Sequence, residues 1–205
     1  MPSNRLSHHL RACAYNNAWA NHRLLRACAQ LTQADFEAPR TGFFPSIKAT
    51  LNHILTVDWF YIDALERNLR GEPPHSDYQS FFRPAEPFAI CGELWAAQRA
   101  SDQRLIDYTS QLSDDALDDI VVIARIDHEQ RDTRERLLAH VFEHQIHHRG
   151  QVHVMLSSTP VAPPQLDEFF CASEAHLRRQ DFAELGWTEE EVWSTESPSH
   201  RARGA

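Results

Sequence analysis

The stretch LLAHVFEHQIHHRGQVHVML, residues 137–156, repeats apolar side chains with the period of an α-helix and carries four histidines within nine residues. On a helix with about 100° per residue, the apolar residues fall on one side, and His144 and His148 fall among them. Two histidines spaced i, i+4 lie one turn apart, close enough to bind a single divalent ion. Because a buried imidazole needs partners for both ring nitrogens, this pair favours a metal site over two isolated core histidines.

The other histidines of this stretch have different positions on the helix. His140 and His147 lie at the edge of the apolar side, where they could donate hydrogen bonds to the metal ligands or line a pocket. His153 lies on the opposite side, and we expect it at the surface. The stretch has no H-E-x-x-H pattern, so the metalloprotease arrangement with its helical glutamate base is absent.

Apolar periodicity of the same kind continues in three other segments, 5–31, 46–69 and 86–111, and the histidine-rich helix itself is expected over 134–157. Pro45 and Ser46 mark the start of the second segment, and Thr133 has the side chain of an N-cap. The β-branched run from Ile120 to Ile126 predicts a short β-hairpin around 120–130, and short helices are expected at 173–184 and 188–194.

Four long amphipathic helices with long connections predict an all-α fold, a four-helix bundle. The length of 205 residues suits one domain, which we place at residues 5–195, followed by a disordered tail at 196–205. The core of such a bundle is a common place for metal sites built from facing helices.

A third metal ligand should come from another helix. His53 is the only histidine of segment 46–69, and its side of that helix is apolar as well. Asp58 lies about 140° away around the helix, so both cannot reach one ion. We therefore expect His53 as a ligand and Asp58 as a structural residue, with Arg149 as one candidate partner for its charge.

Several polar residues interrupt the other apolar stripes. They are candidates for the wall of a pocket, with hydrogen-bonded core residues as the equal alternative: Asn17, Asn21, Gln98 and Ser101. Gly150 is a costly residue in the middle of a helix, and we expect it to permit close packing of a neighbouring helix.

The net charge of −9 argues against a general binder of nucleic acid or of anionic membranes, which would need an excess of Lys and Arg. No stretch of about 18 apolar residues occurs, and the first residues have no apolar signal core, so we expect a cytoplasmic protein with no membrane contact. The four cysteines form no C-x-x-C pair, which disfavours a zinc ribbon or a redox motif.

Two segments together resemble a known family. FFPSIKATLNHILTVDWFYIDAL (43–65) and HVFEHQIHHRGQVHVML (140–156) are similar to the DinB-like (DinB/YfiT) four-helix-bundle proteins, as are YNNAWANHRLL (15–25) and PPQLDEFF (163–170). The resemblance covers about residues 5–195 and implies one divalent metal held by His53, His144 and His148. Glu143 departs from the family, which often has Asn there, but this position lies off the metal face.

Three neutral imidazoles would leave a divalent ion with its full charge and an open position, which is the pattern of a catalytic site. Such an ion lowers the pKa of a bound water or thiol. Imidazole ligands suit zinc, nickel or iron.

The resemblance implies a metal-dependent enzyme with a small-molecule substrate, either a transferase that uses a low-molecular-weight thiol or a hydrolase. The alternatives are a non-catalytic metal- or ligand-binding stress protein, as the damage-inducible family name suggests, and a purely structural bundle. A homodimer is expected from the resemblance alone.

Overall fold

The two helices that carry the predicted ligands begin at the expected caps. In the computed structural model, which describes residues 5–194, α3 (Ile47–Leu69) follows Ser46, whose side-chain oxygen accepts a hydrogen bond from the backbone nitrogen of Ala49 at 3.0 Å. α5 (Arg134–Leu156) follows Thr133, which accepts in the same way from Arg136 at 3.3 Å. Each cap satisfies one backbone N–H that the first helical turn leaves without a partner.

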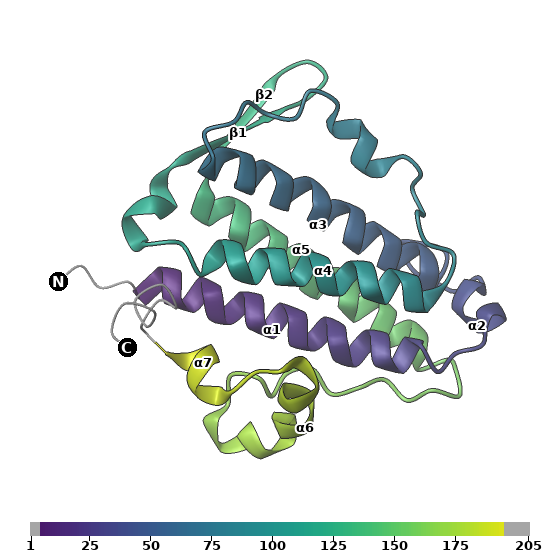
Figure 1. Cartoon of the computed structure of the whole chain (residues 1–205). Coiled ribbons are helices and arrows are strands. Elements are labelled where there is room, and N and C mark those ends of the chain that lie inside the picture. The colour runs from purple at the N-terminus through teal and green to yellow at the C-terminus, as the bar shows by residue number, and fades with distance from the viewer. Residues whose placement is uncertain (1–4, 195–205) are drawn as a thin grey trace.

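Four long helices form a bundle, as the sequence predicts (Figure 1). The other two are α1 (Arg5–Cys28) and α4 (Cys91–Thr109). Around the bundle the helices contact one another in the cyclic order α1, α4, α3, α5. The helices α3 and α5 are therefore neighbours, and the pair α1 and α4 lies on the opposite side.

The shorter elements connect and cover the bundle. The predicted hairpin is present, with antiparallel pairing from Ile120 opposite Thr133 to Ala124 opposite Glu129, and it lies at one end of the bundle (Figure 1). The helices α6 (Ala175–Leu185) and α7 (Glu189–Trp193) pack against α1. The short elements are α2 (Gln33–Glu37), η1 (Tyr78–Phe82), η2 (Asp114–Asp118), β1 (Ile120–Ala124), β2 (Glu129–Thr133), η3 (Ala172–Glu174), α6 (Ala175–Leu185) and α7 (Glu189–Trp193), where η marks a 3₁₀ helix.

Two helix boundaries differ from the prediction. The first helix ends at Cys28 rather than residue 31, and a separate helix, α2, begins after Thr32, whose side chain caps it. The third begins at Cys91 rather than residue 86. The reason is Asn52, whose side-chain amide donates to the carbonyl oxygen of Phe88 and accepts from its nitrogen, both at 2.9 Å. The Asn52 side chain thus satisfies both backbone groups of Phe88 in place of helical partners, and the helix begins after this residue.

The interior of the bundle contains two apolar clusters separated by polar residues. One cluster lies toward the hairpin and includes Trp19, Leu65 and Leu138; the other lies toward α2 and includes Leu24 and Ile47. Between them lies a layer of buried polar side chains from all four long helices, which we call the polar belt. Its members are Asn17, Asn21, Asp58, Gln98, Asp102, Gln145 and Arg149.

Two expectations for α5 are wrong. A side-chain Cβ added to Gly150 would meet nothing within 4 Å, so this glycine does not permit close helix packing. His153 is half-buried rather than at the surface, and its Nε2 lies 2.9 Å from the carbonyl oxygen of Pro164. It therefore holds the connector that leads from α5 to α6.

Among residues 5–194, no helix is both long and apolar enough to cross a membrane. The tail predicted for 196–205 lies outside the described residues.

Candidate metal centre

His53 of α3 meets His144 and His148 of α5. One ring nitrogen from each lies within 4.8 Å of the other two, and the two Nε2 atoms of His53 and His144 lie 3.0 Å apart. Two nitrogens bound to one tetrahedral ion at about 2.0–2.1 Å would lie about 3.3 Å apart, so these two differ from that spacing by a few tenths of an ångström. These are the three residues that the helical period of the sequence predicted as ligands.

All three imidazoles are neutral near pH 7. Burial, and to a smaller extent the neighbouring histidines, lowers the pKa of His53 to about 4 and that of His144 to about 3. The pKa of His148 is also lowered by burial, although Gln151 opposes this shift. A neutral imidazole is the form that binds a metal.

Gln151 orients His148 within α5. Nδ1 of His148 lies 3.0 Å from the side-chain oxygen of Gln151, and since that oxygen only accepts, Nδ1 carries the proton. The amide nitrogen of Gln151 in turn donates to Nε2 of His147 at 2.9 Å. This arrangement leaves Nε2 of His148 with a free lone pair for a metal.

His144 has one ring nitrogen without a hydrogen-bond partner among residues 5–194. Its Nδ1 is buried and has no hydrogen-bond partner in the described part of the chain. A buried polar atom without a partner costs about 1–3 kcal/mol, and such atoms in native proteins are often explained by a functional role. An ion bound by Nε2 of His144 would not satisfy Nδ1, so the case for a metal rests on the three-nitrogen group.

Aromatic residues border the histidines. The ring of Phe44 packs on His53 with centroids 4.3 Å apart and on His148 at 5.5 Å. Phe43, which is 78% exposed, packs edge-on against Phe44. One turn before His144 on the same helix, the exposed His140 packs on the ring of Tyr61 at 4.9 Å. The site is therefore half-buried, with an aromatic rim.

The polar residues predicted for the pocket wall lie elsewhere. Asn17, Asn21 and Gln98 donate to Asp102 within the polar belt and make no hydrogen bond to the histidines. Ser101 is buried, and its hydroxyl has no partner among residues 5–194. Only His140 and His147, of the proposed supporting residues, lie beside the histidine group.

Asp58 has the structural role expected of it. Its carboxylate accepts from Gln98 at 2.7 Å and from Gln145, while burial and the nearby Asp102 raise its pKa to about 7. Arg149 stands in the same belt and donates to Asn21 at 3.1 Å and Gln145 at 3.0 Å.

Two contributors were missed from the sequence. Gln151 follows His148 by three residues, a helical spacing that could have indicated contact. Phe44 lies in the loop before α3, and nothing in its local pattern shows that it covers His53.

A second cluster of possible ligand atoms has a simpler explanation. His22, Asp181 and Glu184 lie close together, but Arg26 bridges both carboxylates at 2.8 Å. Arg23 also binds Asp181, at 2.6 Å. These ion pairs attach α6 to α1 and occupy the atoms that a metal would need.

Comparison with known proteins agrees with this architecture. The model of the DinB family matches residues 4–188. The chain is also 26% identical over 136 residues to the uncharacterized protein YizA of Bacillus subtilis (strain 168), an alignment that covers 66% of this chain and 79% of YizA. With the family model matching nearly the whole bundle, the chain belongs to the DinB family.

Proposed function

We propose that this protein is a metal-dependent enzyme in which His53, His144 and His148 bind one divalent transition metal, zinc, nickel or iron. The observation that carries the proposal is the group of three neutral ring nitrogens within 4.8 Å of one another on two neighbouring helices. No carboxylate belongs to this group, so a bound ion would keep its full charge.

The reaction that we favour is transfer of a low-molecular-weight thiol to an electrophilic carbon. A bound divalent ion supplies positive charge that lowers the pKa of a thiol or a water. The thiol loses its proton, its sulfur forms a bond to the carbon of the second substrate, and the leaving group departs with its electron pair. His140 is exposed beside the site and can accept the proton.

The rim supports a substrate with an apolar part. Phe43 presents most of its ring to solvent beside Phe44, and burial of this surface by a substrate would be favourable. A hydrolase is less well supported because α5 lacks the H-E-x-x-H glutamate that acts as general base for water in helical zinc proteases.

Metal content tests the site itself. Protein purified without a histidine tag should contain about one equivalent of a divalent metal per chain, and His144→Ala should lose it. His128→Ala, which changes an exposed histidine of the hairpin, is the matched control and should keep the metal. Unchanged metal content in His144→Ala would contradict the proposed site.

The reaction is tested with metal-loaded protein, a panel of small thiols (cysteine, glutathione and 2-mercaptoethanol) and either an activated haloarene or an epoxide. We expect formation of the thioether with at least one thiol, and its loss in His144→Ala. Stoichiometric metal with no product from any pair would instead favour the non-catalytic binding protein.

A further inference from the structure

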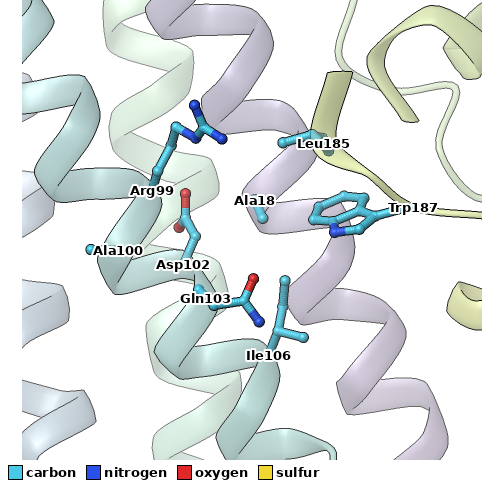
Figure 2. Close-up of a pocket in the computed structure, with 8 residues that line it drawn as sticks. All are labelled: Ala18, Arg99, Ala100, Asp102, Gln103, Ile106, Leu185 and Trp187. Atoms are coloured by element: carbon cyan, nitrogen blue, oxygen red, sulfur yellow. The ribbon is translucent and has the colours of Figure 1, made fainter. Parts of the chain in front are cut away.

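A cavity lies on the side of the bundle away from the histidines. It has a volume of about 230 Å³ and opens between α1, α4 and the segment after α6 (Figure 2). The buried residues Ala18, Asp102 and Ile106 form its floor, and Leu185 and Trp187 form a side wall. This volume is below the range of drug-sized ligands, about 300–1,000 Å³, and suits a smaller molecule.

Asp102 brings a negative charge to this floor. Its Oδ1 accepts from Asn17 at 3.2 Å, Asn21 at 2.9 Å and Gln98 at 3.1 Å. Burial raises its pKa to about 6, so the carboxylate is ionised at neutral pH. No hydrogen bond reaches Oδ2 within the described residues, although Asp102 is only 4% exposed. Asp102 therefore lines the cavity with a carboxylate oxygen that has no hydrogen-bond partner among the described residues.

The charges around Asp102 favour a cation over an anion. The polar belt contains two carboxylates, Asp58 and Asp102, and one guanidinium, Arg149. An anion in the cavity would lie against the Asp102 carboxylate and be repelled by it, whereas a cation would be attracted. Figure 2 shows the indole of Trp187 across the cavity from the Asp102 carboxylate, where it can pack against an apolar group.

The mouth of the cavity has the opposite charge. Arg99 and Gln103 are exposed and line the opening, and Arg99 precedes Asp102 by three residues on α4. Figure 2 shows the Arg99 guanidinium above the Asp102 carboxylate, although no ion pair joins them. The cavity thus has a negative charge at its floor and a positive charge at its mouth.

We propose that this cavity binds a small zwitterion of the α-amino acid class with an apolar side chain. The ammonium group would lie on the Asp102 carboxylate, and the carboxylate of the ligand would pair with Arg99. The side chain would pack on Ile106 and Trp187. This site shares no lining residue with the histidine group and is independent of the proposed metal chemistry.

Three probes of the same carbon skeleton test the charges. L-leucine, isoamylamine and 4-methylpentanoate are each titrated into the full-length protein, and binding is followed by calorimetry and by amide chemical shifts. We expect leucine to bind at least ten times more tightly than isoamylamine, and 4-methylpentanoate to bind most weakly. Binding of 4-methylpentanoate as tight as that of leucine, or no binding of leucine at millimolar concentration, would overturn the proposal.

Variants locate the site. Ala100 and Ala96 are exposed alanines one turn apart on α4, and only Ala100 lines the cavity. Ala100→Leu should weaken leucine binding at least tenfold, whereas Ala96→Leu should not change it. Asp102→Asn should abolish the preference for ligands with an ammonium group, and Arg99→Gln should reduce the advantage of leucine over isoamylamine.

A final control separates this site from the histidines. His144→Ala should bind leucine with the same affinity as the wild type, because the two sites lie on opposite sides of the bundle. Loss of binding in His144→Ala, or equal weakening by the Ala100 and Ala96 substitutions, would show that leucine binds elsewhere and would contradict the proposal.

Discussion

Gln151 and His148 form a hydrogen-bonded pair one helical turn apart on α5, with 3.0 Å between the side-chain oxygen of Gln151 and Nδ1 of His148. The same amide reaches His147, so the three side chains form a continuous chain at the edge of the metal centre. Pairing of this kind fixes which ring nitrogen carries the proton and which nitrogen is left to bind a metal.

Replacement of Gln151 by Ala should weaken metal binding while leaving the three histidines in place. The loss of such a supporting partner typically lowers metal affinity about 10–100-fold. Gln151→Glu should keep most of the affinity, because a carboxylate also accepts from Nδ1. Competition with a chromophoric chelator measures both, with Gln180→Ala on α6 as the control. Equal affinity of Gln151→Ala and the wild type would show that the pair does not support the site.

The histidines should make the metal-free protein sensitive to acid. Their folded pKa values, about 4 for His53 and about 3 for His144, lie below the ordinary value of 6.5. The unfolded chain therefore binds more protons, and the stabilisation present above pH 6.5 is lost as the pH falls through the folded values. His144→Gln should lose less stability than the wild type between pH 6.5 and 4. Urea unfolding at several pH values measures this difference. An equal fall of the free energy of unfolding with pH in both proteins would contradict the prediction.

Asp58 should make the protein less stable as the pH rises, which is the opposite pH dependence to that of the histidines. Its folded pKa of about 7 lies above the ordinary value of 3.8, so its contribution is fully present below pH 3.8 and is lost as the pH rises through 7. Asp58→Asn retains an oxygen that can accept from Gln98 and Gln145. The variant should therefore gain stability relative to the wild type as the pH rises from about 5 to 8. A constant difference between the two proteins over this range would show that Asp58 does not titrate there.

Gly150 should be replaceable with a gain in stability. A Cβ at this position meets nothing within 4 Å, and glycine in a helix interior costs about 0.5–1 kcal/mol relative to alanine. Gly150→Ala should raise the free energy of unfolding by roughly that amount. Gly186→Ala should lower it, because Gly186 ends α6 with a φ of +77°. Denaturant unfolding compares the two, and destabilisation by Gly150→Ala would reveal a packing role that the geometry does not show.

The long helices and the spacing of the histidines could be predicted from the sequence because both are local. Apolar periodicity located all four helices, Ser46 and Thr133 located two of their starts, and a β-branched run located the hairpin. The i, i+4 spacing of His144 and His148 places both on one side of α5 in any helical conformation. These features depend on residues within one or two turns of each other.

Tertiary structure alone decided which polar residues meet. Asn17, Asn21 and Gln98 face the interior as predicted, but Asp102 and Arg149 draw them into the polar belt rather than toward the histidines. The shortened start of α4 likewise depends on Asn52, which lies 36 residues before Phe88 in the chain. A local pattern shows which side of a helix is buried. It does not show which partner satisfies a buried hydrogen-bonding group, because that depends on the packing of all four helices.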